Sequence, residues 1–315
     1  MTGPTIAMVA AKAGVATSTV SRALSNPTRV SASTRRHVED VARELGYVAL
    51  SKARTRCVAV LVADLGNPFY FDIIRGTHAQ LRASDHTQLL IDTEESGELE
   101  ADLIQRLRPS IDGVILAASR LSDAAIARLS KSLPLVVINR HVPDVPTVVM
   151  DTADGMRQAL EHLVSLGHRE IAYVAGPDRS WANASRWRAL GEAALVHGVE
   201  LRRIGPFAPR RESGAAAADA LLNSGASAAI AYNDLLAIGM LARLDERGVR
   251  VPADLSIVGC DDIFGADFAH PTLTTVTSPI EQAGRVAVTL LLAGRRDGVL
   301  LPTHLTVRAS TGVAR

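Results

Sequence analysis

Residues 17–25, "TSTVSRALS", carry polar side chains that could contact nucleic acid. Val20 and Leu24 are spaced for the inner face of one helix, which leaves the polar side chains facing outward. An arginine can donate two hydrogen bonds to the edge of a guanine, whereas short hydroxyl side chains reach phosphate oxygens. The outward-facing candidates are Thr17, Ser18, Ser21 and Arg22.

Two further predicted helices would hold this helix in place. The first breaks at Gly14, because glycine tolerates the backbone of a tight turn. The third starts near Ser31 and ends at Gly46, a residue suited to a left-handed helix cap. Two helices joined by a short glycine turn form a helix-turn-helix, so we expect residues 1–48 to be a three-helix head. The inner faces would be Ile6, Val9, Ala10 and Ala13, then Val38, Val41, Ala42 and Leu45.

Charge separates this head from the rest of the chain. Residues 1–56 contain nine Lys or Arg and three Asp or Glu, a balance of +6, although the net charge of the whole chain is only +1. Residues 57–315 are therefore acidic, at −5. Such asymmetry is typical of a nucleic-acid-binding module attached to a neutral or acidic domain. The alternative is a solvated basic surface on a small helical domain.

The head resembles that of the lactose-repressor and galactose-repressor (LacI/GalR) family of bacterial transcription regulators. The motifs that carry the resemblance are Ala13-Gly14-Val15, Thr19-Val20-Ser21-Arg22 and Val30-Ser31. The family usually has an acidic residue where this chain has Met8. The resemblance implies that Thr17, Ser18 and Arg22 meet base edges in the major groove. It also implies phosphate contacts from Thr5, Thr19, Ser21, Ser31 and Thr34.

Residues 49–56 are predicted to be a short linker. The family normally threads a helix here that enters the minor groove as a dimer and wedges a leucine between base pairs. This chain has fewer residues in "VALSKARTRCVAV" and has lost the leucine-bearing stretch, unless Leu50 substitutes. We therefore expect weak minor-groove insertion or none, with Lys52 and Arg54 meeting phosphates instead.

Composition limits the class of protein. The 315 residues are 47% hydrophobic, enough for a head and two further core-bearing lobes. With no apolar run of about 18 residues and no signal peptide, a cytoplasmic protein without membrane contact is expected. Cys57 and Cys260 lie far apart in the sequence and form no metal or redox motif, so buried reduced thiols are expected. No metal or cofactor is predicted.

From Cys57 onward, short apolar runs such as "CVAVLVA", "GVILAA", "LVVIN" and "LSIVGC" alternate with amphipathic stretches. Continuous apolar strands separated by helices indicate parallel sheets covered on both faces, an α/β fold. About seven strands over some 250 residues suit two doubly wound lobes better than one sheet. We place the first lobe at 57–151 and 280–307, and the second at 152–279 and 308–315.

Polar residues follow these strands repeatedly, as they would around a ligand at the carboxyl ends of a parallel sheet. The pattern resembles the periplasmic-binding-protein-like core of the same family, with marks such as "DLGNPFY", "AYNDLLAIGML" and "VRAST". The resemblance implies a ligand cleft with Arg188 as its anchor, since the arginine fork could bind two hydroxyls or a carboxylate. The implied ligand residues are Asn67, Phe69, Asn139, Arg188, Asn233 and Asp261, with Phe207 and Ser278 as weaker candidates.

Each candidate also has a structural interpretation. Asn233 and Asp234 could simply cap the following helix, Asp261 could shape a turn, and Phe69 could belong to the core. The ligand is expected to be a pentose or hexose, with a nucleoside or an anionic metabolite as alternatives. Two departures bear on this choice: sugar binders of the family often have a carboxylate in place of Asn139 and an aromatic residue in place of Cys260.

Three classes of function compete. A ligand-responsive transcription regulator explains the head, the charge split and the two lobes. The resemblance implies that it is a repressor that binds operator DNA. A solute-binding protein would share the core but lack the head. An enzyme would need a reaction centre, and the sequence contains no phosphate loop, nucleophile elbow or metal-binding His pair. A homodimer is expected, because two heads can read half-sites about 34 Å apart. By analogy, its interface would include residues 70–82.

Overall fold

The computed structural model describes residues 4–25, 29–47 and 55–315. The chain forms two compact units, Met1–Thr55 and Arg56–Arg315. Most of the predicted linker, including Leu50, Lys52 and Arg54, lies outside the described residues. Its conformation and its DNA contacts stay predictions.

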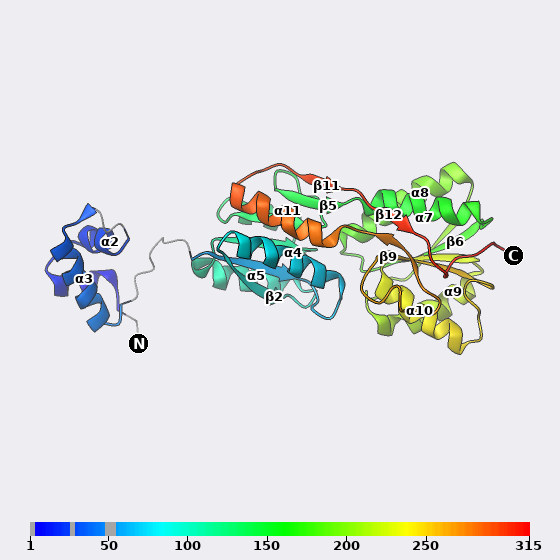
Figure 1. Ribbon diagram of the computed structural model, residues 1–315, viewed down its shortest axis with the longest axis horizontal. Helices are drawn as coiled ribbons and strands as arrows, with labels where there is room; N and C mark the ends of the chain where they lie inside the picture. Colours follow the sequence, from blue (N-terminus) through cyan, green and yellow to red (C-terminus); the bar gives the residue numbers. More distant parts are fainter. Residues whose placement is uncertain (1–3, 26–28, 48–54) are drawn as a thin grey trace. The chain divides into compact units, whose positions relative to one another are not determined.

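The first unit contains helices α1 (Ile6–Ala13), α2 (Thr17–Ser25) and α3 (Ala32–Glu44) (Figure 1). Gly14 ends α1 with a left-handed backbone, φ 63°, and its N–H is directed to the carbonyls of Ala10 and Ala11. The predicted three-helix head with a helix-turn-helix is confirmed. Its core is formed by Val9, Ala10, Ala13, Val20, Ala23, Val38, Val41 and Ala42.

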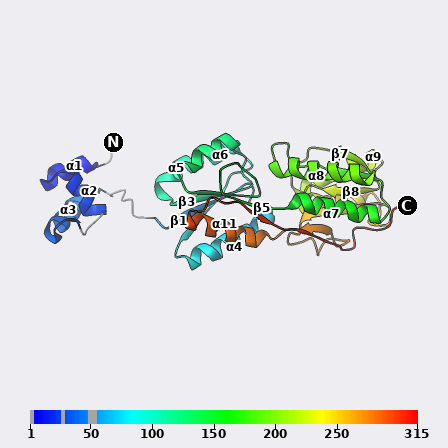
Figure 2. The same ribbon diagram turned by 90° about the horizontal axis from the view of Figure 1, so that it is seen from above.

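The first lobe of the second unit has a parallel sheet with the strand order β11-β5-β4-β3-β1-β2. Successive residues of β1 are buried on opposite faces, Val58 against α4 and α11 and Ala59 against α5 and α6. Figure 2 shows these two helix pairs covering the two faces of the sheet. The elements are β1 (Cys57–Val62), α4 (Phe69–Ala83), β2 (Thr87–Asp92), α5 (Gly97–Leu107), β3 (Gly113–Ala117), α6 (Asp123–Ser130), β4 (Leu135–Ile138), β5 (Thr147–Met150), α11 (Ile280–Ala293) and β11 (Val299–Leu301).

The second lobe has the strand order β12-β10-β9-β8-β6-β7, in which only the edge strand β12 is antiparallel. Helices α7 and α8 cover one face, and α9 and α10 cover the other (Figure 1). The predicted pair of doubly wound sheets is confirmed. The elements are α7 (Thr152–Ser165), β6 (Glu170–Val174), α8 (Trp181–His197), β7 (Glu200–Ile204), α9 (Gly214–Ser224), β8 (Ala228–Ala231), α10 (Asp234–Glu246), β9 (Ser256–Asp261), β10 (Thr274–Thr277) and β12 (His304–Thr306).

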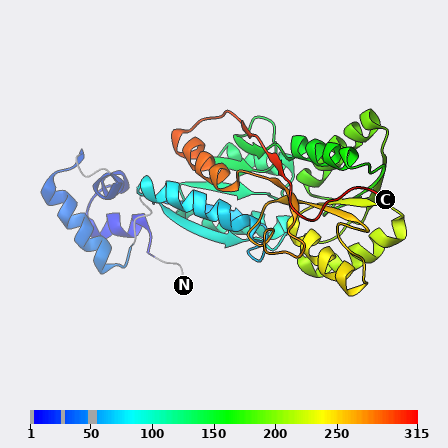
Figure 3. The ribbon, with the colours of Figure 1, turned by 45° about the vertical axis from the view of Figure 1, so that its right-hand side comes forward.

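Within residues 55–315, the chain passes between the lobes three times: between β5 and α7, between β10 and α11, and between β11 and β12. Figure 3 shows the last passage as the red segment that leaves the first lobe for the second. The predicted boundary after residue 307 is wrong, because β12 already pairs with β10 of the second lobe. The apolar signal of this short edge strand is too weak to assign it to a sheet from sequence.

Helices α4 and α11 approach each other through glycines. A Cβ atom added at Gly76 would lie 2.1 Å from the carbonyl oxygen of Glu281, and one at Gly284 would lie 2.6 Å from that of Ile73. Both obstacles are backbone atoms, so relief would require the helices to separate. The first lobe therefore depends on the absence of side chains at this crossing.

We expect Gly76→Ala to lower the free energy of unfolding by about 3 kcal/mol or more, because overpacking a close helix crossing forces backbone shifts. Gly191→Ala in α8 is the matched control, since a Cβ there would meet nothing within 4 Å. That change should raise stability by up to about 1 kcal/mol through helix propensity. Urea unfolding followed by circular dichroism measures both, and equal effects of the two substitutions would contradict the close-approach argument.

Candidate ligand cleft and nucleic-acid interface

The outer face of α2 has the composition that the sequence predicted. Val20 is fully buried against the other helices of the head. The opposite face offers one guanidinium group and several hydroxyls to a partner, while Thr19 is partly buried. The exposed residues are Thr17, Ser18, Ser21 and Arg22.

The predicted phosphate contacts Thr5, Ser31 and Thr34 lie at the N-termini of α1 and α3. The Thr5 hydroxyl accepts a hydrogen bond from the Met8 N–H at 3.4 Å, and Ser31 Oγ accepts one from the Thr34 N–H at 3.1 Å. Thr5 and Ser31 are exposed, and Thr34 is partly buried. Thr5 and Ser31 thus cap helix N-termini, whose N–H groups attract anions, and the Thr34 hydroxyl lies 2.8 Å from Ser31 Oγ.

A cleft between the two lobes collects the polar side chains at the strand ends. The space between these side chains, including the mouth open to solvent, is about 340 Å³. Of the eight predicted ligand residues, five line it: Asn67, Phe69, Asn139, Asn233 and Asp261. The remaining lining residues are Tyr70, Glu95, Ala118 and Arg120 of the first lobe and Arg186, Pro209 and Tyr232 of the second.

Four lining residues have a left-handed backbone although none is glycine. Their φ angles are 60° at Glu95, 55° at Ala118, 59° at Asn139 and 113° at Asp261. They come at or just after the ends of β2, β3, β4 and β9, respectively. Such conformations are costly for residues with a Cβ and gather at binding sites. The strand ends are therefore bent so that these residues line the cleft.

Arg186 lines the cleft from the second lobe, and the prediction that Arg188 points into the cleft is wrong. Arg186 donates to Thr152 Oγ1 at 3.3 Å, to the Tyr232 carbonyl, and to Asp261 Oδ1 at 3.1 Å. Residues two apart on a helix point about 200° away from each other. Arg188 therefore faces solvent on α8 and is exposed, whereas the Arg186 side chain is only 2% exposed.

The electrostatics of this pair explain why a buried guanidinium is tolerated. Burial opposes the charged form of Arg186, but neighbouring groups, among them the Asp261 carboxylate, raise its pKa above the ordinary value. Burial raises the pKa of Asp261, and the charge of Arg186 acts in the opposite direction. The cleft thus contains a cation and a carboxylate held together and able to bind polar groups.

Two asparagines line the cleft while they stabilise local structure. Asn233 Oδ1 accepts the Leu236 N–H at 3.1 Å as the cap of α10, and its Nδ2 donates to the Pro209 carbonyl at 3.2 Å. Asn67 Oδ1 accepts the Phe69 N–H at 3.0 Å. The capping interpretation of Asn233 is therefore present in the structure together with its place in the cleft.

Asn139 has spare hydrogen-bonding capacity. Its side chain is 7% exposed, and its Oδ1 atom is buried without a hydrogen-bond partner among the described residues. Burying an unpaired acceptor is costly, so this atom is suited to a ligand hydroxyl or N–H.

The two weaker candidates do not line the cleft. Phe207 is partly buried and packs against the core of the second lobe. Ser278 is buried in the segment that passes between the lobes, and its Oγ has no hydrogen-bond partner among the described residues. Asp151, which also follows a strand, caps α7 instead by accepting the Asp154 N–H.

Sequence reasoning missed Tyr70, Glu95, Arg120, Arg186 and Tyr232. Two of them carry the signal of the residues that were found, namely a polar side chain shortly after a strand, although β2 before Glu95 is only partly buried. Glu95 follows "LLID" and Arg120 follows "GVILAAS". Tyr70 and Tyr232 carry no polar signal of this kind, because aromatic residues at these positions also suit the core.

Asp234 follows the cleft residue Asn233 in the chain and is fully buried. Its carboxylate accepts hydrogen bonds from Thr275 Oγ1 at 2.6 Å and from the Ile263 N–H at 2.9 Å. Burial, together with the charge of Asp261, raises the pKa of Asp234 from 3.8 to about 7. The folded chain therefore holds this proton more tightly than the unfolded chain does, so stability falls as the pH rises through this interval.

We expect the stability of the wild type relative to Asp234→Asn to fall by on the order of 4 kcal/mol between pH 4 and pH 8. Urea unfolding across this range measures the difference. Asp254→Asn is a control of opposite sign, because the Arg250 hydrogen bond lowers the pKa of Asp254 and its contribution is lost as the pH falls. A difference between wild type and Asp234→Asn that does not change with pH would contradict the prediction.

Other chemistry is limited in the part of the chain that the structure describes. It contains no group of three or more His, Cys, Asp or Glu placed to hold a metal ion. Cys260 is buried and Cys57 partly buried, both as free thiols. None of its helices is long and apolar enough to cross a membrane.

A helix-turn-helix head followed by a two-lobed core with a polar cleft is the architecture of a ligand-responsive regulator of transcription. Residues 5–49 match the model of bacterial regulatory proteins of the lacI family, and residues 160–311 match a periplasmic binding protein-like domain. The chain is 34% identical to the HTH-type transcriptional repressor CytR of Escherichia coli, over 98% of this chain and 97% of the relative. It belongs to the LacI family and is a regulator, not an enzyme.

Solved structures agree over both units. One is the complex of the transcriptional regulator CelR with cellobiose, with a TM-score of 0.74 and 34% identity over 98% of this chain and 99% of that one. Another is the lac repressor dimer bound to operator and the anti-inducer ONPF, with a TM-score of 0.75 and 26% identity over 99% of this chain and 100% of that one.

Proposed function

We propose that this protein represses transcription by binding operator DNA as a homodimer, and that a neutral sugar bound between the lobes controls its affinity for DNA. The observation that carries the ligand part is the buried Arg186–Asp261 pair in the same cleft as Asn139, whose Oδ1 has no hydrogen-bond partner among the described residues. Together they offer donors and acceptors in a desolvated place, as recognition of a polyhydroxylated molecule requires. The protein would act in the cytoplasm, where its operator lies.

The balance of charge in the cleft favours a neutral ligand. Its formal charges are the two arginines Arg120 and Arg186 and the two carboxylates Glu95 and Asp261, which cancel. Each arginine is already paired with a carboxylate, so an anionic metabolite would meet two negative groups as well as two positive ones. Phe69 could pack against the apolar face of a sugar ring. A pentose or hexose therefore suits the cleft better than an anion, and a nucleoside is the second candidate.

The DNA part rests on the exposed face of α2. Thr17, Ser18 and Arg22 would read base edges, while Thr5, Thr19, Ser21, Ser31 and Thr34 would hold phosphates, with Lys52 and Arg54 adding charge. One head reads too few base pairs for specificity, whereas two in a dimer would read paired half-sites. The related lac repressor was solved as a dimer on operator. Half-exposed Phe71 on α4 gives the proposed interface an apolar residue.

The ligand can control DNA binding only if it binds two arrangements of the dimer with different affinities. A thousandfold change in operator affinity requires about 4 kcal/mol of coupling. The three passages between the lobes allow a ligand that draws the lobes together to reposition the first lobes of a dimer relative to each other.

A gel-shift experiment on the promoter beside the gene, with and without pentoses, hexoses and nucleosides, tests the proposal. We expect a shifted complex whose affinity changes with a sugar. A reporter fused to this promoter should be more active when the gene is deleted, as repression requires. Absence of any shift under all conditions would instead favour a solute-binding role.

A further inference from the structure

We infer that Glu95 and Arg120 form a second recognition pair. The pair contacts the end of the effector that lies against the first lobe and selects the effector by the polar groups at that end. This inference rests on the proposed function. The effector it implies is a neutral molecule with two polar ends, each presenting a hydrogen-bond donor beside an acceptor, as vicinal hydroxyls do.

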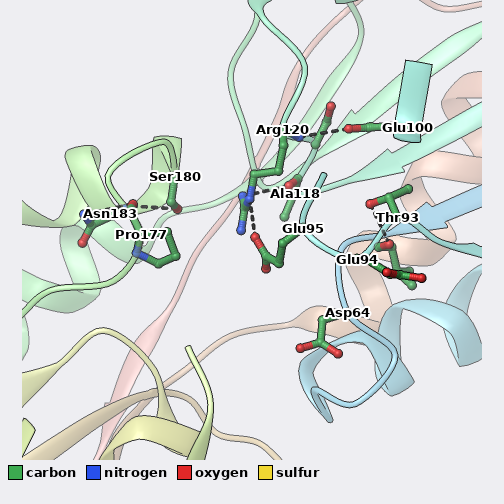
Figure 4. Close-up of polar contacts among 12 residues, drawn as sticks. Asp64, Thr93, Glu94, Glu95, Glu100, Ala118, Arg120, Pro177, Ser180 and Asn183 are labelled. Atoms are coloured by element: carbon green, nitrogen blue, oxygen red, sulfur yellow. Dashed lines mark hydrogen bonds and ion pairs between the residues drawn. The ribbon is translucent and has the colours of Figure 1, made fainter. Parts of the chain in front are cut away.

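The pair is partly buried in the wall of the cleft. Arg120 Nε lies 2.5 Å from Glu95 Oε2, and the two side chains are 9% and 22% exposed. Arg120 also donates from Nη1 to the Ala118 carbonyl at 2.9 Å. Figure 4 shows the guanidinium and the Glu95 carboxylate facing each other, with dashed lines to Glu95 and to Ala118.

This pair is the counterpart of Arg186 and Asp261. Both pairs join an arginine to a carboxylate and both line the same cleft, one from each lobe. Tyr232 of the second lobe lines the same cleft. A guanidinium beside a carboxylate offers a donor next to an acceptor, which complements two neighbouring hydroxyl groups.

The first lobe holds the pair rigidly. The backbone N–H of Arg120 donates to Glu100 Oε2 at 3.0 Å, and Glu100 is itself almost completely buried. Glu95 and Ala118 both have the left-handed backbone described above. A pair that served only to tie the β2 and β3 loops together would not need to line the cleft. Preorganisation of this kind is what binding selectivity needs.

The test compares Glu95→Gln with Glu94→Gln in the full chain. Glu94 is the adjacent residue, is exposed and has a similar backbone, φ 49°, so it is a matched control. Isothermal calorimetry would be run against D-ribose, D-glucose, cellobiose, adenosine and uridine. For the probes that the wild type binds, Glu95→Gln should weaken binding about 10- to 100-fold, because a hydrogen bond to a charged group is lost. Glu94→Gln should bind like the wild type.

Deoxy analogues of the bound probe, each lacking one hydroxyl, identify the end that the pair contacts. One analogue should bind the wild type weakly and show no further loss with Glu95→Gln, since the partner hydroxyl is already gone. The series is made from whichever probe binds, a sugar or a nucleoside, so it also shows which of these two classes of molecule supplies the hydroxyl that the pair contacts. Circular dichroism and thermal unfolding verify that Glu95→Gln folds.

Unchanged affinity of Glu95→Gln for every probe that the wild type binds would overturn the inference. If Arg186→Lys still weakened binding in that case, the proposed function would stand without it. If the wild type bound none of the sugars or nucleosides, the proposed function would fail, and the inference with it.

Discussion

Arg186→Ala is expected to weaken effector binding at least a hundredfold and to lower the unfolding free energy of the core by about 3 to 5 kcal/mol. The change would leave the Asp261 carboxylate buried without its cation. It would also remove donors from the Tyr232 carbonyl and from Thr152 Oγ1. A single side chain thus connects α8, β9 and the end of β8 at the floor of the cleft. Calorimetry with the effector and urea unfolding measure the two effects.

Arg188→Ala is the matched control, two residues further along the same helix and exposed. It should change both quantities by less than about 0.5 kcal/mol, as surface substitutions usually do. Arg186→Lys gives an independent measure if the alanine variant does not fold, because it keeps the charge and loses the fork. A larger loss of binding in Arg188→Ala than in Arg186→Lys would show that the anchor has been misassigned.

Arg22→Ala should reduce affinity for the cognate operator about 10- to 100-fold, the value of one bidentate contact with a base pair. Arg22 is exposed near the end of α2, beyond the buried Val20. Affinity for unrelated DNA should fall much less, because that binding depends on phosphate contacts from many residues. Fluorescence anisotropy with operator and with scrambled duplexes measures the two affinities at the same salt concentration.

Arg43→Ala is the control for this prediction. Arg43 lies on α3 and pairs with Asp40 at 3.0 Å, so its removal takes the same charge from the head. It should lower the affinities for operator and scrambled duplex by the same small factor. Equal loss of both affinities in Arg22→Ala would mean that Arg22 contacts phosphate and not a base.

The fold was predictable because its signals are local and strong. The apolar run of β1 is buried on both faces, as residues Val58 and Ala59 show, and helical spacing in the head located α2 to the residue. The exposed face of α2 followed from the same spacing. The strand β12 was assigned to the wrong lobe because three residues cannot show which sheet they join.

The cleft was predictable in part. Strand ends reveal which loops meet, so Asn139 and Asp261 were found. Arg186 and Arg188 are indistinguishable by type, and only the rotation of α8 against the sheet decides which of them is buried. Glu95 and Arg120 each lie three residues beyond the end of a strand, and their positions depend on left-handed turns that contain no glycine to signal them in the sequence. The sequence could not predict which side chains of distant loops pair with each other in the cleft.

The three passages between the lobes have a consequence for biosynthesis. The head is complete once residue 47 has left the ribosome, whereas the first lobe lacks its edge strand β11 until residue 301 has emerged. The second lobe then waits for β12. Translation therefore completes the helix-turn-helix head long before either lobe of the core. A nascent chain interrupted before residue 301 would have neither lobe complete.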